Sequence, residues 1–143
     1  MIMYSNTAWP PYVSLVANVK FGSYHHIKLD MGLKPNQAAR MVARIRHQVK
    51  LPLVVEMETN EIKSRLVRLA QAVAAAGANV IMLTAGDFTS AKAALSDLSP
   101  KITLPLFVRC PITTSDEQQE LQALGAAQVI PAMASELVLA ATN

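Results

Sequence analysis

The chain has 143 residues, of which 52% are hydrophobic, and its 13 basic and 10 acidic residues leave a formal charge of +3. This composition fits one globular domain and excludes a disordered chain. The charge surplus is too small to indicate nucleic acid or a membrane surface by itself. The single cysteine, Cys110, excludes an intrachain disulfide and a multi-cysteine metal site. No apolar run reaches the roughly 18 residues of a membrane helix, and the N-terminus lacks a signal pattern, so we expect a cytoplasmic protein without membrane contact.

Six segments are expected to form strands, because each contains a short apolar run rich in β-branched residues. The first connection, residues 20–24, is too short for a parallel crossover, so the first two strands form a hairpin or are joined in an unusual way. The six segments are residues 11–19, 25–32, 49–57, 74–83, 102–110 and 122–132.

The helices between these strands have recognisable start and stop signals. Pro35 is suited to a first helical turn, and Thr59 or Asn60 is suited to cap the next helix. Asp87 or Thr89 is expected to cap a third helix, and Thr114 with Glu117 has the capping-box spacing of a fourth. Gly77 and Gly125 stand where left-handed C-caps end the second and fourth helices, and residues 134–143 are expected to form a last short helix.

A strand-helix-strand unit is repeated in the sequence. The segment LPLVV begins at Leu51 and LPLFV at Leu104, and each is followed by a helical stretch that ends in Gly77 or Gly125. The repeat spacing of about 50 residues indicates a doubled βαβ unit and hence a parallel sheet. Because the strands are continuously hydrophobic, we expect burial on both of their faces.

The predicted fold is therefore a single α/β domain over residues 1–143, with a mainly parallel sheet of five or six strands and helices on both faces. Residues 1–24 would form an N-terminal strand or edge segment, and residues 25–143 the repeated βα units. Two arrangements satisfy this pattern: a flavodoxin- or Rossmann-like open sheet, and a fragment-like partial β/α barrel.

The runs IKLDMGLKPN, VARIRHQVKLPLVVEMETN and LVRLAQAVAAAGANVIMLTAG resemble the middle of flavin-binding (β/α)8-barrel enzymes of the dihydroorotate dehydrogenase type. The resemblance implies a barrel-type fold and flavin mononucleotide as a possible cofactor. Glu56 stands where that family carries a flavin-contacting lysine, and Asp30 where it usually carries asparagine. Cys110-Pro111 and Pro131-Ala132 replace its phosphate-binding glycines.

The order of elements from Ile27 onward is also similar to response-regulator receiver domains, especially in ALGAAQVIPAMASELVLA. Thr84-Ala85-Gly86 replaces the phosphate-accepting aspartate of that family, and Pro131 replaces its lysine. The same C-terminal segment resembles the nucleotide-binding regulatory domains of potassium transporters, but Gly32 alone represents their glycine-rich loop.

Ligands of parallel α/β sheets bind at the carboxyl ends of the strands, which indicates where the functional residues lie. The predicted ligand-binding residues are Asp30, Gly32, Glu56, Asn60, Thr84, Gly86, Asp87, Thr113, Thr114 and Ser115. Thr113 to Ser115 would hold a phosphate or serve as ordinary helix caps, and capping is favoured.

Three carboxylates, Asp30, Glu56 and Asp87, could converge on a divalent cation. A capping role for Asp87 and solvated strand-end positions for the other two are favoured, so no metal site is predicted. Cys110 is expected to be a buried apolar residue rather than a nucleophile. Eight basic side chains on two helices lack accompanying aromatics, so nucleic acid is not expected: Arg40, Arg44, Arg46, His47, Lys50, Lys63, Arg65 and Arg68.

These patterns favour a small non-catalytic or degenerate module that binds a ligand or another protein. Its sheet edges favour self-association or a partner protein, with residues 9–19 as a candidate edge cover. Two alternatives stay open: a divergent enzyme that binds flavin or a small phosphorylated ligand and is completed by a partner subunit, and a receiver-like scaffold that works without phosphorylation. No catalytic residue is assigned.

Overall fold

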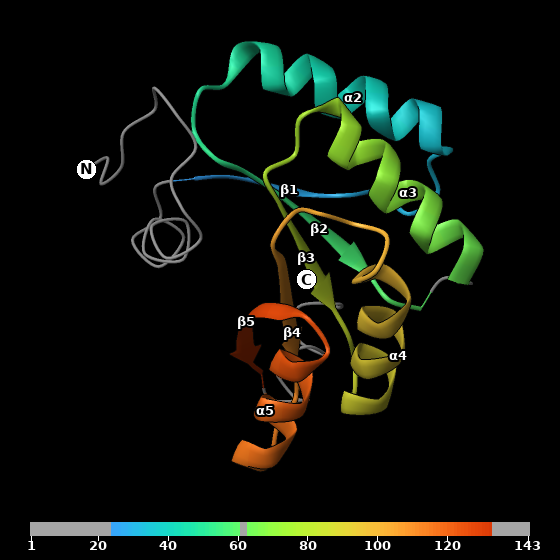
Figure 1. Ribbon diagram of the computed structural model, residues 1–143. Helices are drawn as coiled ribbons and strands as arrows, with labels where there is room; N and C mark the ends of the chain where they lie inside the picture. The colour runs from blue at the N-terminus through green and yellow to red at the C-terminus, as the bar shows by residue number, and fades with distance from the viewer. Residues whose placement is uncertain (1–23, 61–62, 133–143) are drawn as a thin grey trace.

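Strands and helices alternate along the described chain, which in this computed structural model comprises residues 24–60 and 63–132 (Figure 1). The expected strand 11–19, the edge-covering segment and the last helix lie outside these residues. The elements are β1 (His25–Lys28), α2 (Pro35–Gln48), β2 (Leu53–Glu58), α3 (Lys63–Ala76), β3 (Val80–Thr84), α4 (Phe88–Leu98), β4 (Leu106–Cys110), α5 (Ser115–Ala123) and β5 (Ala126–Pro131).

The five strands form one parallel sheet in the order β1-β2-β3-β4-β5. The predicted fold class, a single α/β domain with a parallel sheet, is confirmed. The strand order distinguishes its two predicted arrangements. A flavodoxin-like sheet has the order 2-1-3-4-5, in which the winding direction reverses once. No such reversal occurs among the described strands, and their sequential order is that of a β/α barrel.

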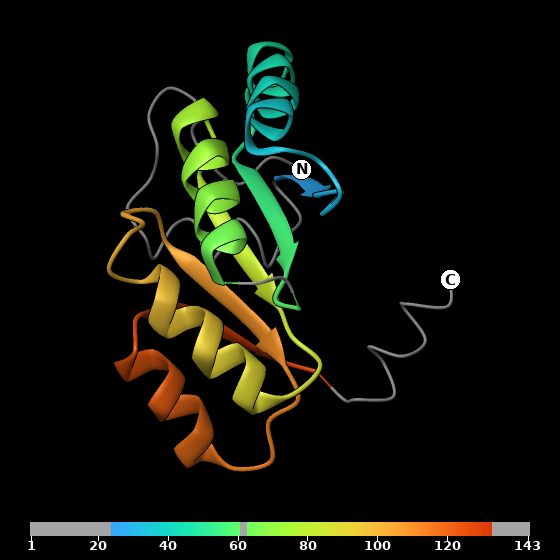
Figure 2. The ribbon, with the colours of Figure 1, turned by 90° about the vertical axis from the view of Figure 1, so that its right-hand side faces the viewer.

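All four described helices lie on the same face of the sheet, as Figure 2 shows. This corrects the expectation of helices on both faces. Consecutive parallel strands are joined by right-handed crossovers, so a sheet that never reverses its order places every helix on one side. The main core lies between these helices and alternate strand residues, which include Leu53, Val55, Met57, Ile81 and Val108.

The other face of the sheet has its own composition. A small apolar cluster of Val54, Val80, Met82 and Phe107 occupies its middle. Because side chains alternate along a strand, Glu56 and Glu58 point to this face from β2, while Met57 between them belongs to the helix-side core. The carboxyl end of this face is therefore polar, although each strand is apolar along most of its length.

The predicted helix signals are largely confirmed. Pro35 is the first residue of α2, the Asp87 side chain accepts a hydrogen bond from the Ser90 N–H, and the Thr114 side chain accepts one from the Glu117 N–H. Gly77 and Gly125 have φ angles of 123° and 120°, which supports both the C-cap prediction and the repeat that they define. No helix of the described residues is long and apolar enough to cross a membrane.

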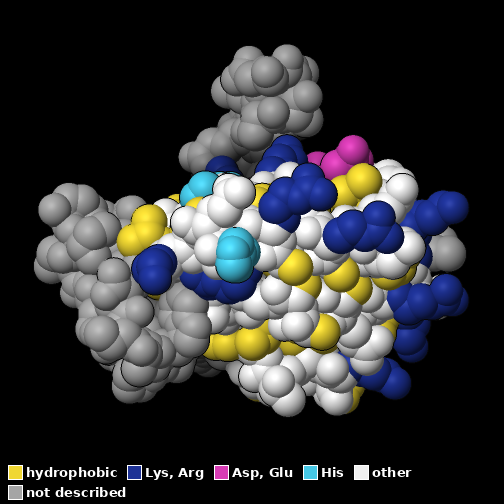
Figure 3. Space-filling view, turned by 90° about the horizontal axis from the view of Figure 1, so that it is seen from above, with side chains coloured by type: hydrophobic (Ala, Val, Ile, Leu, Met, Phe, Trp, Pro, Cys, Tyr) yellow, Lys and Arg dark blue, Asp and Glu magenta, His cyan; other side chains and the backbone are white. Residues whose placement is uncertain are grey.

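An arginine on α2 and another on α3 hold neighbouring loops in place through hydrogen bonds to backbone carbonyls. Arg46 donates to the Leu51 carbonyl at 2.8 Å, and Arg65 donates to the Leu33 carbonyl at 2.7 Å and also to the Met31 carbonyl. Figure 3 shows dark-blue Lys and Arg side chains spread over the surface seen from above.

Candidate functional site

A cavity of about 390 Å³ opens at the carboxyl ends of the strands, on the face opposite the helices. Its strand-borne lining consists of Lys28, Glu56, Glu58, Thr84 and Arg109. The sheet register brings three of these side by side, since Glu58 pairs with Thr84 and Thr84 pairs with Arg109. A carboxylate, a hydroxyl and a guanidinium thus lie side by side on three neighbouring strands.

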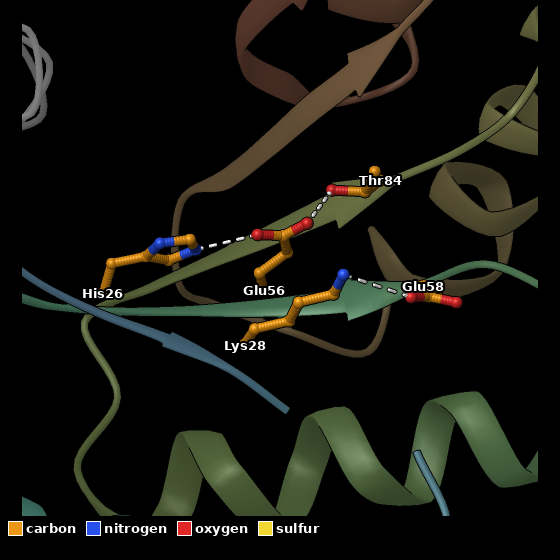
Figure 4. Close-up of polar contacts among 5 residues, drawn as sticks. All are labelled: His26, Lys28, Glu56, Glu58 and Thr84. Carbon is orange, nitrogen blue, oxygen red and sulfur yellow. Dashed lines mark hydrogen bonds and ion pairs between the residues drawn. The ribbon is translucent and has the colours of Figure 1, made fainter. Parts of the chain in front are cut away.

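Glu56 is a buried carboxylate with a partner on each oxygen (Figure 4). The Thr84 hydroxyl donates to Oε2 at 2.7 Å, and His26 Nε2 lies 2.8 Å from Oε1. The side chain of Glu56 is only 7% exposed, against 40% for His26. The hydrogen bond from His26 holds the pKa of Glu56 below its usual value, although burial acts in the opposite direction.

The ionised state of Glu56 fixes the roles of both partners. An ionised carboxylate only accepts hydrogen bonds, so His26 must carry its ring hydrogen on Nε2, and the Thr84 hydroxyl must point its hydrogen at Glu56. The sequence analysis expectation of a solvated Glu56 is therefore wrong. Its neighbours on β1 and β3 cover it and replace water as its hydrogen-bond donors.

Lys28 and Glu58 form the outer part of the site. Lys28 Nζ lies 3.6 Å from Glu58 Oε1, and the two side chains are 55% and 44% exposed (Figure 4). An ion pair as exposed as this one contributes about 0–1 kcal/mol, so it does not fix either group firmly. Both side chains stay available to a ligand that enters the cavity.

Arg109 differs from every other charged group of the cavity. It is half-buried on β4, next to Thr84 in register, and lines the cavity. Within residues 24–60 and 63–132, its guanidinium makes no hydrogen bond or ion pair. A guanidinium that is partly withdrawn from water and has no protein acceptor is set up to receive an anion.

Among the predicted ligand-binding residues, Glu56, Asn60, Thr84, Gly86 and Asp87 line this cavity. Asp87 also caps α4, because its Oδ1 accepts the Ser90 N–H at 2.7 Å. Hydrogen bonding from Ser90 holds the pKa of Asp87 below its usual value. The structure thus brings five of the ten predicted residues to one place.

Asp30 and Gly32 line a separate, more open hollow that shares only Lys28 and Glu58 with the cavity. Asp30 Oδ1 accepts the Gly32 N–H at 2.9 Å, which closes a local turn. Arg65 donates to carbonyls on either side of Gly32 and ties this turn to α3. The loop after β1 is therefore held as a turn between strand and helix.

Thr113, Thr114 and Ser115 stand apart from the cavity, at the start of α5. The Thr113 backbone N–H donates to Glu117 Oε1 at 2.9 Å, its hydroxyl lies 3.0 Å from the same oxygen, and Thr114 caps the helix. The capping role favoured from the sequence is the one the structure shows. A phosphate there would meet Glu117, which already occupies the N–H of Thr113.

The three carboxylates considered for a metal do not converge. Glu56 is bonded to His26 and Thr84, Asp30 to its own turn, and Asp87 to the cap of α4. The described part of the chain has no group of three or more His, Cys, Asp or Glu residues placed to hold a metal ion. Cys110 belongs to the helix-side core, where burial raises its pKa to about 11.

Four residues of the site are absent from the predicted ligand-binding set: His26, Lys28, Glu58 and Arg109. A signal for them exists in the sequence. In HHIK and LFVRC, a polar residue alternates with buried ones near the carboxyl end of a strand, as Lys28 does with Ile27 and Arg109 with Val108. Such alternation marks a face that the helices do not cover.

A sequential parallel sheet, helices on one face and a cavity at the carboxyl ends together define a partial barrel of the TIM type. Among solved structures, the chain is similar to a mutant tryptophan synthase alpha-subunit from the hyperthermophile Pyrococcus furiosus, with a TM-score of 0.56 and 15% sequence identity. The match covers 84% of this chain and 49% of that one, so the chain spans about half the length of the structure it matches. At this identity the likeness shows the fold alone. No family model matches the sequence, and no curated protein matches it.

Proposed function

We propose that this chain is a ligand-binding module that holds a small anion, a carboxylate or a phosphate, in the cavity at the carboxyl ends of β2, β3 and β4. The observation that carries the proposal is Arg109, a half-buried guanidinium that lines the cavity and makes no hydrogen bond or ion pair within the described residues. Its planar donors suit the paired oxygens of either group.

The location supports the proposal, since partial and complete β/α barrels present their functional residues at the carboxyl ends of the strands. The volume of about 390 Å³ lies near the small end of the roughly 300–1,000 Å³ range of ligand pockets. Lys28 adds a second cation whose bond to Glu58 is weak enough to be exchanged for a ligand.

The acidic residues of the cavity limit what it can accept. Both oxygens of Glu56 already accept a hydrogen bond, one from His26 and one from Thr84. Two further carboxylates line the cavity: Glu58 lies beside Lys28, and Asp87 lies on the loop after β3. These two carboxylates disfavour a ligand with several negative charges, so a carboxylate or a singly charged phosphate fits Arg109 better than a doubly charged phosphate.

Binding can be tested by thermal shift and by heteronuclear NMR titration with inorganic phosphate, acetate and flavin mononucleotide. Saturation of a single site at 100 times Kd adds about 2.7 kcal/mol to the free energy of unfolding. We expect stabilisation by at least one anion in the wild type and none in Arg109→Met. Arg44→Met, on the exposed side of α2, is the matched control and should behave like the wild type.

Two results would contradict the proposal. One is an equal shift in Arg109→Met and the wild type, which would place the anion elsewhere. The other is the absence of any shift with all three anions. A shift with flavin mononucleotide but not with acetate or phosphate would favour the alternative of a divergent flavin-binding protein.

We also propose that the chain associates with a second copy or with a partner protein through its sheet edges. Among the described strands, β1 pairs only with β2, and β5 pairs only with β4, so each has one edge without a neighbouring strand. Exposed parallel edges are sites of strand addition. Light scattering after gel filtration tests this directly, and a monomer at every concentration up to several hundred micromolar would contradict it.

A further inference from the structure

The Thr84 hydroxyl has a fixed polarity toward the cavity. Its hydrogen points to Glu56 Oε2 at 2.7 Å, and Glu56 cannot supply a hydrogen of its own because it is ionised. His26 occupies the other oxygen at 2.8 Å and holds the carboxylate in place. What Thr84 still offers to the cavity that it lines is the lone pairs of its oxygen, and these only accept hydrogen bonds.

The residue next to Thr84 has the opposite polarity. Arg109 pairs with Thr84 in the β3–β4 register, so both side chains leave neighbouring strands on the same face. A guanidinium has only donors. On the other side of Thr84, its β2 partner Glu58 is a second acceptor. Two acceptors, Glu58 and Thr84, and one donor, Arg109, therefore lie in a row across β2, β3 and β4.

We propose that the cavity selects a small anion that carries an O–H or N–H donor beside its charged group, such as a hydroxy acid, an amino acid or a hydroxylated phosphate ester. The anionic group binds Arg109, and the neighbouring donor binds the oxygen of Thr84. The inference rests on the proposed function, since it specifies the ligand of the same cavity. Thr84 is then the residue that determines specificity, and Glu56 and His26 are positioning residues.

The test compares probes that differ only in the donor. Glycolate and propionate have nearly the same shape, but only glycolate carries a hydroxyl next to its carboxylate. The pair 2-hydroxyethyl phosphate and propyl phosphate repeats the comparison with a phosphate. Dissociation constants are measured by chemical-shift titration of the labelled protein. We expect the hydroxylated member of the bound pair to bind about three- to tenfold more tightly, which is the usual range for one net hydrogen bond.

Variants at position 84 assign the preference. Thr84→Ser keeps the hydroxyl and should keep the preference, whereas Thr84→Val keeps the shape and should bind both members equally. Because Thr84→Val also removes a donor from Glu56, its amide spectrum is compared with that of the wild type before titration. The probe comparison in the wild type decides the matter even if that variant does not fold.

The outcomes separate this inference from the function on which it rests. Equal affinities for both members of each pair, with binding lost in Arg109→Met, would overturn the donor selection and leave the anion site standing. A preference that survives in Thr84→Val would also overturn it. No binding of any of the four probes would overturn both proposals.

Discussion

Arg46 and Asn79 join the end of α2 to the start of β3: the Arg46 guanidinium donates to Asn79 Oδ1 across 2.6 Å. The same oxygen accepts the backbone N–H of Leu53 at 3.1 Å, at the start of β2. Arg46 also donates to the carbonyls of Val49 and Leu51, between α2 and β2. One amide oxygen and one guanidinium thus organise the amino end of the sheet, opposite the cavity.

Replacing Asn79 with alanine should therefore destabilise the protein by about 1–3 kcal/mol, because it leaves the donors of Arg46 and Leu53 without their shared acceptor. Urea unfolding measures the loss. Asn79→Asp keeps an oxygen and adds a charge opposite Arg46, so it should stay close to the wild type. A loss of similar size in both variants would show that the oxygen is not the important feature.

Gly77 leaves room for the Arg46 side chain at the same end of the sheet. Its φ angle of 123° is one that side chains rarely adopt, and a Cβ atom at this position would lie 2.6 Å from Cγ of Arg46. Gly77→Ala should cost at least about 1 kcal/mol of the free energy of unfolding. Gly86→Ala is the control, because a Cβ there meets nothing within 4 Å. Equal unfolding midpoints for the two variants would contradict the packing argument.

Glu56 should make stability depend on pH in the acid range. Its pKa is below 4.5 in the folded protein, so as pH falls through about 4.5 the unfolded chain takes up a proton at this position before the folded chain does. The stabilisation is therefore complete above this pH and is lost as pH falls through the folded pKa.

Asp87 and Glu117 also have lowered pKa values, so the acid dependence of the wild type alone does not isolate Glu56. The difference in the free energy of unfolding between the wild type and Glu56→Gln isolates the contribution of Glu56. We expect this variant to be less stable by about 1–2 kcal/mol at pH 7 and to approach the wild type as the pH falls through the lowered pKa of Glu56. A difference that stays constant from pH 7 to pH 3 would contradict a lowered pKa at Glu56.

Cys110 should be unreactive in the native protein. Its side chain is fully buried, and desolvation is the main reason why its pKa rises to about 11, with the charges of Glu117 and Asp87 adding to the effect. At pH 8 about one thiol in a thousand would be ionised. Iodoacetamide should label it only after unfolding in urea, and rapid labelling of the native protein at pH 8 would contradict this.

The local features of the fold could be predicted because each depends on a few adjacent residues. Pro35, Asp87 and Thr114 start helices by their own geometry or side-chain oxygens, and Gly77 and Gly125 end them by adopting positive φ angles. The side of the sheet on which the helices lie depends on the strand order. That order is a relationship between distant segments, which no local pattern contains.

The site was predictable to the extent that it follows from position along the strands. Glu56 and Thr84 stand at strand ends, and both line the cavity. Arg109 stands among apolar residues, so its alternation with buried Val108 and Cys110 is the only signal that separates β4 from a continuously buried strand. The burial of Glu56 could not be predicted, because its partners on β1 and β3 lie 30 and 28 residues away in sequence.

The sequential strand order also bears on how the chain reaches this structure. Each described strand pairs with the strand that comes next in the chain, as Val54 does with Val80 and Leu83 with Val108. Such pairing keeps the loops that must close during folding short, which lowers their entropic cost. A sheet of the same strands in a rearranged order would need longer loops to close first, so the sequential order favours faster folding.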